Sequence, residues 1–272
     1  MRVTFWGVRG TFPATGERFA RYGGDTMCIE VECGGARLIL DAGSGLRALG
    51  VKLDAESEAG PTHIILSHLH LDHIMGLPHF APFWRKDARV LIHAPMESVG
   101  DDARATLLSV LRPPLFPLEA GDLPAAVALQ EYRIGARLFP APGVRVNTFA
   151  VSHQGPCAGI VVETDRCKLA YVTDHEHGDA QVDDRVAAAV EGADLLIYDA
   201  TFTDAEWSAY RGWGHSTWEE GVRLKQRAGA RLLALAHHHP DRADAQLDTA
   251  GELASARSSN AFFARQGLSL SL

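Results

Sequence analysis

The chain has 272 residues, a length that suits one large domain or two small ones. Hydrophobic residues make up 46% of it, enough for a large buried core, and no run of 18 apolar residues indicates a membrane-spanning helix. The formal net charge of −8 argues against a protein that holds long nucleic acid mainly through its phosphates, whereas a small phosphorylated substrate is compatible with it.

Short apolar strands, separated by turn signals and helices, make up the first half of the chain. The Gly34-Gly35 pair predicts a hairpin turn between the second and third strands. The proline-rich run from Arg112 onward is expected to end the last helix of this half. In chain order we predict strands at Arg2 to Trp6, Met27 to Cys33 and Arg37 to Leu40, a helix at Leu46 to Val51, strands at His63 to Ser67 and Arg89 to His93, and a helix around Asp101 to Leu111.

The second half repeats this alternation. We predict strands at Arg145 to Ser152, Ala158 to Glu163 and Lys168 to Thr173, a helix at Asp183 to Glu191, a strand at Asp194 to Asp199, a helix at Thr217 to Ala228 and a strand at Arg231 to Ala236. Two β-rich halves with interspersed helices favour two sheets packed face to face with the helices outside. No linker or low-complexity segment divides the chain, so we expect a single domain over residues 1–272.

The first residues, Met1 to Gly7, lack the long apolar core of a signal peptide and are typical of a first strand. We therefore expect a cytoplasmic protein whose four cysteines stay reduced. A disulfide between Cys157 and Cys167 across a hairpin is the less favoured alternative.

Histidine and aspartate gather directly after one predicted strand, in the segment from Ser67 to His73. His68 and His70 are two residues apart at the strand end, so both side chains are expected on one side. Asp72 and His73 follow in the turn into a short helix. Histidine nitrogen and carboxylate oxygen are usual ligands of zinc and also suit iron or manganese. Four such side chains within six residues predict a metal site rather than a polar loop with accidental histidines.

Three more candidate ligands stand where later buried strands end: His153, Asp174 and His237. Taken alone, His153 fits a structural or surface histidine equally well, and the joint order is what indicates a site. His238 and His239 are alternatives to His237. We prefer His237 because it directly follows its strand.

In this ligand order the sequence resembles the metallo-β-lactamase superfamily, whose order is His-x-His-x-Asp-His, then His, Asp and His. The resemblance spans nearly the whole chain and implies an α/β fold of the αββα sandwich type, with two mixed sheets flanked by helices. It also implies two divalent metal ions, zinc in the first place and manganese or iron as alternatives. The implied ligands are His68, His70 and His153 for one ion, Asp72, His73 and His237 for the other, and Asp174 as a bridge.

Asp41 matches the early strand-end aspartate that supports the histidine loop in this superfamily. A turn-forming role before the following glycine is compatible with that. True β-lactamases of this fold carry a cysteine at the position of Asp174 and lack the histidine at the position of His73. Glyoxalase II and lactonase branches place a Gly-His-Ser/Thr motif at the third histidine, where this chain has Ser152-His153-Gln154. The resemblance therefore disfavours these branches.

The phosphodiesterase group related to ribonuclease Z fits best. It has an acidic-Ala-Thr-Phe segment, matched by Asp199 to Phe202, and a Gly-His-Ser-Thr segment, matched by Gly214 to Thr217. The segment from Arg21 to Cys28 is similar to one in bacterial cyclic-nucleotide phosphodiesterase-like members, with Asp25 in place of the usual Asn. Ribonuclease Z itself carries a long tRNA-gripping arm between the third histidine and the bridging aspartate, and here only a hairpin's length separates them. The resemblance thus implies a small phosphodiester substrate, such as a cyclic nucleotide, and no long nucleic acid.

The resemblance also implies how the reaction proceeds. Water activated by two metal ions attacks the ester, Asp72 and Asp174 orient it, and His215 stabilises charge or protonates the leaving oxygen. A helix-cap role of the segment around His215 is the alternative. Trp213 beside it fits a base-stacking residue and a core residue equally well.

The segment from about 78 to 142 is a candidate lid. Its apolar side chains would line the pocket or form a homodimer interface: Trp84, Leu111, Leu115 and Phe116. A carboxylic ester, thioester or lactone hydrolase on the same metal ions is the rival enzyme. A non-catalytic metal-binding protein is a further alternative, disfavoured by the complete ligand set.

Overall fold

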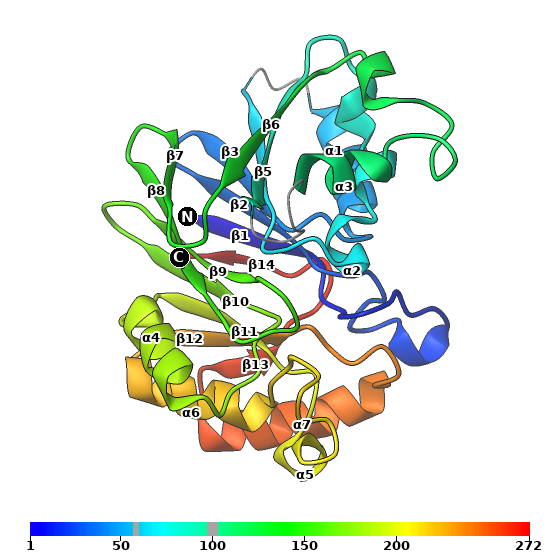
Figure 1. Cartoon of the computed structure of the whole chain (residues 1–272). Helices are drawn as coiled ribbons and strands as arrows, with labels where there is room; N and C mark the ends of the chain where they lie inside the picture. Colours follow the sequence, from blue (N-terminus) through cyan, green and yellow to red (C-terminus); the bar gives the residue numbers. More distant parts are fainter. Residues whose placement is uncertain (57–59, 97–102) are drawn as a thin grey trace.

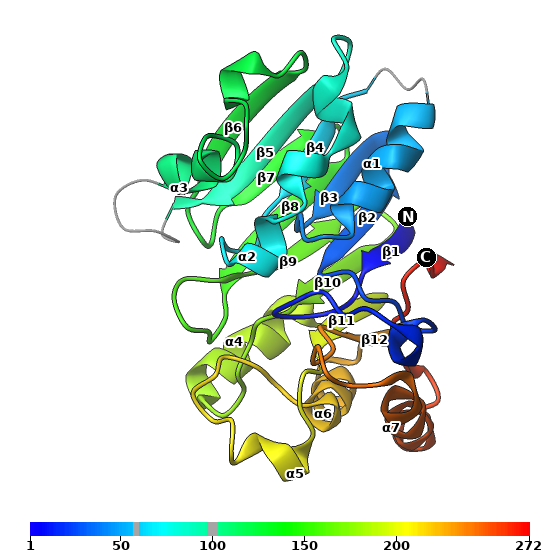
Figure 2. The same ribbon diagram turned by 90° about the vertical axis from the view of Figure 1, so that its right-hand side faces the viewer.

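The computed structural model describes residues 1–56, 60–96 and 103–272. Within these residues the strands form two mixed sheets of seven strands each. The sheets face one another, and helices cover the outer face of each (Figures 1 and 2). This arrangement is the αββα sandwich that the sequence predicts.

In the first sheet the strand pairs from β14 to β3 are antiparallel, and the pairs from β3 to β6 are parallel. Gly34 and Gly35 form the expected turn between β2 and β3, both with positive φ, which glycine adopts without steric penalty. In order across the sheet the strands are β14 (Ser269–Ser271), β1 (Arg2–Gly7), β2 (Cys28–Cys33), β3 (Ala36–Leu40), β4 (Thr62–Ile65), β5 (Arg89–Pro95) and β6 (Ala126–Tyr132).

The second sheet has the same plan, with an antiparallel part from β7 to β10 and a parallel part from β10 to β13. Its edge strand β7 contains Pro140, which an edge position tolerates because one side of the strand needs no donor. In order across the sheet the strands are β13 (Ala261–Phe263), β12 (Leu232–Ala236), β11 (Leu195–Asp199), β10 (Lys168–Val172), β9 (Ala158–Glu163), β8 (Val144–Ala150) and β7 (Arg137–Ala141).

Successive side chains along a strand point to opposite faces of its sheet, and the buried apolar side chains therefore form three layers. In β3, Leu38 and Leu40 pack between the sheets, whereas Ile39 packs under the helices of the first sheet. A third cluster lies between the second sheet and its helices. The α-helices are α1 (Leu46–Ala55), α2 (Leu71–Ile74), α3 (Ala103–Ser109), α4 (Ala180–Val190), α5 (Asp204–Trp207), α6 (Trp218–Ala228) and α7 (Asp244–Arg257). Short 3₁₀ helices are η1 (Glu17–Phe19), η2 (Leu77–His79), η3 (Ala81–Trp84) and η5 (Ala120–Asp122).

The candidate lid over 78–142 includes three strands, β5, β6 and β7, that belong to the sheets. Leu111 is buried in the layer under the helices, whereas Leu115 is 71% and Trp84 43% exposed. Any cover over the site is therefore confined to the segments between these strands. The lid and the homodimer interface stay predictions. The first residues of the helix expected from Asp101 lie outside the described residues, and α3 begins at Ala103.

No helix among the described residues is long and apolar enough to cross a membrane. All four cysteines are free thiols, so the bridge between Cys157 and Cys167 is absent. The chain also forms α7, which the sequence analysis did not predict, and in which Leu247 and Ala254 are buried against the second sheet's cluster.

Two histidines are buried in the sandwich away from the strand ends. His63 and His93 stack with ring centroids 5.3 Å apart, and their facing nitrogens are 3.0 Å apart. They alternate with Ile64 and Ile92, which pack under the helices, so the pair lies on the side toward the second sheet. Burial lowers the pKa of His63, and it lowers the pKa of His93 to about 4.

This pair predicts a loss of stability in mild acid. Between pH 6.5 and about 4 the unfolded chain binds protons at these positions and the folded chain does not. The free energy of unfolding therefore decreases as the pH is lowered through this range. For His93 alone the full effect is about 3 kcal/mol. Denaturant titrations with chelator at pH 7 and at pH 4.5 measure the stability that is lost on acidification. The double variant with His63→Leu and His93→Leu should lose less stability between these pH values than the wild type. Equal losses in the two proteins would contradict the prediction.

Candidate metal centre

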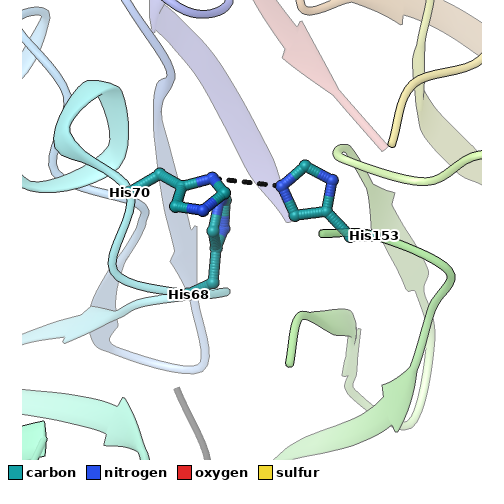
Figure 3. Close-up of side chains that lie close together, drawn as sticks. All are labelled: His68, His70 and His153. Atoms are coloured by element: carbon teal, nitrogen blue, oxygen red, sulfur yellow. Dashed lines mark hydrogen bonds between the residues drawn. The ribbon is translucent and has the colours of Figure 1, made fainter. Parts of the chain in front are cut away.

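Three histidines from the two sheets form the first group of ligand-type side chains, His68, His70 and His153. His68 and His70 leave the end of β4, and His153 follows β8 in the opposite sheet. Figure 3 shows the rings of His70 and His153 facing each other, with His70 Nδ1 3.1 Å from His153 Nε2. These histidines come from different sheets and lie far apart in the sequence, and the fold brings them together at one edge of the sandwich.

Asp72, His73 and His237 form a second group beside the first. The Nε2 atom of His73 lies 3.3 Å from Oδ2 of Asp72, and that of His237 lies 3.6 Å from the same oxygen. The rings of His73 and His237 stack with centroids 5.6 Å apart. All three side chains are buried, so water competes little for their ligand atoms.

Asp174 lies between the two groups and turns one oxygen to each. Its Oδ1 is 4.0 Å from His68 Nε2 and 3.7 Å from His153 Nε2. Its Oδ2 is 3.1 Å from His73 Nε2 and 3.3 Å from His237 Nε2. This is the geometry of a carboxylate placed to contact two cations at once.

The cluster holds buried polar atoms without hydrogen-bond partners: Nε2 of His68, His73 and His237, and Oδ2 of Asp174. Leaving such atoms unsatisfied costs about 1–3 kcal/mol each, and native proteins rarely accept several together. Burial alone would raise the pKa of Asp174, but His237 and His73 hold it well below its usual range. A carboxylate that faces several imidazole nitrogens without hydrogen-bond partners fits two divalent metal ions.

Asp41 supports the histidine loop from behind. Its carboxylate accepts hydrogen bonds from Ser67 N at 2.7 Å, Ser67 Oγ at 2.8 Å and Tyr171 Oη at 2.6 Å. The Nδ1 atom of His73 lies 2.7 Å from the same carboxylate, so Nε2 is the nitrogen that faces Asp174. The sequence analysis anticipated Asp41 in this position but missed Tyr171, which reaches across from the second sheet.

The geometry separates the three consecutive histidines after β12. His237 points to Asp72 and Asp174, and its Nδ1 lies 3.0 Å from Thr201 Oγ1. The Nε2 atom of His238 is 2.9 Å from the carbonyl oxygen of Ala264, and burial lowers the pKa of His238 to about 3. His239 belongs to none of the ligand groups among the described residues.

His215 is oriented by a carboxylate that the sequence analysis did not assign to the site. Asp199 Oδ2 lies 3.0 Å from His215 Nδ1, and the same carboxylate accepts hydrogen bonds from the backbone of Asp174 and Ser216. The ring of His215 stacks on His237 with centroids 4.9 Å apart. Asp199 is a strand-end aspartate like Asp174, and that shared position was the signal that could have revealed it.

The segment after Asp174 braces the loop around His153. Glu176 accepts hydrogen bonds from Gly212 N and Gly214 N, and Gly214 O lies 2.9 Å from His153 Nδ1. His177 lies 2.8 Å from Ser216 Oγ through Nδ1 and is outside the ligand groups. The role of Glu176 depends on contacts 36 residues or more away, which no local motif reveals.

The N-terminal segment from Arg9 to Thr11 runs across the second group of ligands. Thr11 N donates to Asp72 Oδ2 at 2.7 Å, and Gly10 N donates to His238 O at 3.0 Å. A Cβ atom at Gly10 would lie 2.1 Å from the ring of His237. This segment therefore connects Asp72 after the first sheet to the loop of His237 and His238 after the second, and only glycine fits at its centre.

Trp213 is 58% exposed, which excludes its interpretation as a core residue. Thr217 accepts a hydrogen bond from Glu220 N and so caps α6. The capping is done by Thr217, while His215 itself faces Asp199. The helix-cap role of this segment is thus present, and the role of His215 toward an ester oxygen stays a prediction.

Residues 36–238 match the family described as the beta-lactamase superfamily domain. The chain belongs to the beta-lactamase superfamily. A relative in Halorubrum lacusprofundi, named ribonuclease Z, is 28% identical over 87% of this chain and 86% of its own length. Human tRNase Z, short form, superposes with a TM-score of 0.72 and 21% identity, over 100% of this chain and 99% of that one. A diphosphatase from the PhnP family gives a TM-score of 0.73 and 16% identity, over 100% of this chain and 97% of that one.

Membership of this superfamily, together with the cluster, makes the chain a metal-dependent hydrolase of the metallo-β-lactamase fold. The solved structures, at identities below 25%, add the fold. The family match stops at residue 238 and begins at residue 36, so the segment from Arg9 to Thr11 lies outside it.

The contact of Gly10 with His237 predicts a selective loss of metal. In Gly10→Ala the new methyl group must displace the imidazole, so we expect about one metal equivalent per chain by elemental analysis, against about two in the wild type. Gly60→Ala is the matched control, because its Cβ would meet no atom within 4 Å. Two tightly held equivalents in Gly10→Ala would show that the segment does not position this group.

Proposed function

We propose that this chain is a binuclear metal-dependent phosphodiesterase that acts on a small phosphodiester such as a cyclic nucleotide. The observation that carries the proposal is the pair of Asp199 and His215 beside the ligand cluster, with nitrogen and oxygen 3.0 Å apart. A buried carboxylate that holds one imidazole nitrogen leaves the other to act on an ester oxygen. The names of the relatives, ribonuclease Z and tRNase Z, add support for a phosphodiester bond as the target.

The proposed metal ligands are those of the two groups, with Asp174 shared between them. Their nitrogen and oxygen donors favour zinc, with manganese or iron as alternatives. When bound, two such ions supply Lewis-acid polarisation of phosphoryl oxygens and lower the pKa of a water molecule.

The side chains have separate proposed roles. Asp72 and Asp174 orient the attacking water, since their carboxylates lie among the ligand-type histidines, Asp174 3.1 Å from His73 and Asp72 3.6 Å from His237. Asp199 fixes the ring of His215 through Nδ1, and in the doubly protonated ring Nε2 carries the proton that the leaving oxygen takes up.

A small substrate is favoured by charge and by topology. The net charge of −8 disfavours a long polyanion, and β9 and β10 are joined by a connection of only residues 164–167. There is thus no inserted arm at that place in the chain. RNA is the second candidate substrate, since the relatives are named as ribonucleases.

The proposal predicts the outcome of a substrate comparison. Protein loaded with zinc or manganese should hydrolyse 2′,3′-cyclic AMP and bis(4-nitrophenyl) phosphate, and Asp174→Ala at equal protein concentration should lose most of this activity because it touches both ligand groups. Phosphomonoesters, lactones and thioesters are measured in parallel. A preference for a lactone or thioester would overturn phosphodiester chemistry. Cleavage of a folded tRNA precursor in preference to the small diesters would assign RNA instead.

The role given to His215 predicts dependence on the leaving group. Nitrophenolate departs as an anion, whereas an alkoxide needs a proton, and general acid catalysis is worth about 10²–10⁴-fold where it is needed. His215→Ala should therefore keep both metals and lose far more activity on a cyclic or alkyl diester than on a nitrophenyl diester.

His177→Ala is the matched control for this variant, because His177 contacts Ser216 outside the ligand groups. It should affect both substrates alike. If His215→Ala loses the same factor on both substrates, His215 stabilises phosphoryl charge and does not donate a proton.

A further inference from the structure

A cavity of about 180 Å³ lies next to the candidate centre but is not lined by its ligands. It is formed where the loop after β11 and α5 meet the start of α7, and Figure 2 shows these elements on the face that also presents α2. Its lining residues are Phe202, Glu206, Tyr210, His239, Asp241, Arg242 and Gln246.

One aromatic ring separates this cavity from the histidine proposed as acid. Phe202 meets His215 edge to face, with ring centroids 6.1 Å apart, and lies at 6.0 Å from His239 on the cavity side. The ring of His215 in turn stacks on His237 at 4.9 Å. Phe202 is 3% exposed, so a substituent on an ester oxygen at His215 would pass beside this ring to enter the cavity.

The cavity walls combine the half-buried ring of Tyr210 with polar edges, since Phe202 is only 3% exposed. Tyr210 stacks on Phe202 with centroids 4.4 Å apart and an angle of 8° between the rings. At the edges stand the imidazole of His239 and the amide of Gln246, whose Oε1 accepts a hydrogen bond from Ala243 N.

The cavity is not built for a second phosphate. Arg242 donates to both oxygens of Glu206, at 2.9 and 2.7 Å, and to Thr201 O at 3.2 Å. Asp241 adds a further negative charge to the lining. The one cation of the lining is therefore neutralised, and an uncharged polar group suits the site better than an anion.

We propose that this cavity is the subsite for the heterocyclic ring of a nucleoside phosphodiester, with Phe202 and Tyr210 as the apolar wall and His239 and Gln246 as hydrogen-bonding groups. The proposal rests on the proposed phosphodiesterase function. It specifies which group attached to the phosphodiester the same site would bind. Trp213, 58% exposed and edge-on to Tyr210 at 5.3 Å, extends this aromatic surface toward Gly214 and the ligand His153.

The test measures binding of three phosphates that differ only in their substituent. Methyl phosphate, benzyl phosphate and thymidine 5′-monophosphate are titrated into metal-replete protein by calorimetry. Stacking of a base on an aromatic side chain typically raises affinity about 5- to 150-fold, so the nucleotide should bind more tightly than methyl phosphate by a factor in this range. Benzyl phosphate should gain less, because it lacks the groups that His239 and Gln246 recognise.

Variants of the cavity then locate the gain. Tyr210→Ala and the cavity-filling Gln246→Trp should bring the nucleotide close to the affinity of methyl phosphate, whereas Tyr210→Phe should keep most of the difference. Phe139→Ala, an exposed aromatic on β7 with 68% of its surface accessible, is the matched control and should change nothing. In every variant the affinity for methyl phosphate should stay within about twofold.

The outcomes separate the subsite from the function. A protein that hydrolyses diesters but binds methyl phosphate and the nucleotide equally refutes the subsite alone. Equal gains for benzyl phosphate and the nucleotide refute recognition of a heterocycle. A protein that binds the nucleotide through Tyr210 but hydrolyses no diester supports the subsite and refutes the phosphodiesterase.

Discussion

The carboxylate of Asp174 is the contact on which the arrangement of the centre depends. It faces imidazole nitrogens of both sheets, Nε2 of His73 at 3.1 Å and Nε2 of His237 at 3.3 Å, and these two nitrogens have no hydrogen-bond partner. In the absence of cations such an arrangement is held open against the cost of unsatisfied polar groups. The fold meets that cost through the large apolar layer between the sheets, which fixes the strand ends from which the ligands project.

The same strand ends show how the backbone aims the side chains. Asp41, Asp174 and His237 each follow a strand, and each has a positive φ, between 55° and 59°. This left-handed conformation is uncommon for residues other than glycine, aspartate, asparagine and histidine, and costs about 1–3 kcal/mol. Each strained residue is held by hydrogen bonds, such as that from Asp174 N to Asp199. The strain therefore turns three side chains toward one point where an extended strand would have carried them apart.

Sequence reasoning found the parts of the site that depend on local order and missed those that depend on distant contacts. His68, His70, Asp72 and His73 lie within six residues at a strand end, so their proximity follows from β4 alone. The fold class and most strand positions likewise follow from alternation and turns. Tyr171 and the segment at Gly10 act through partners more than 30 residues away, and no spacing rule contains that information. The helix α7 was missed because its buried residues are only Asp244, Leu247 and Ala254, which make no apolar stripe at helical spacing.

The connection between the segment from Arg9 to Thr11 and the loop after β12 also has a consequence for biosynthesis. Arg9 is fully buried and donates to the carbonyl oxygens of His239 and Arg242, more than 220 residues away. Because the ribosome makes the chain from its N-terminus, Asp72 and His73 emerge long before His237 and the contacts that hold it. Contacts of such long sequence separation form late in folding. A nascent chain therefore offers incomplete groups of ligand-type side chains, and the proposed binding of a second ion has to wait until the last third of the protein has been translated.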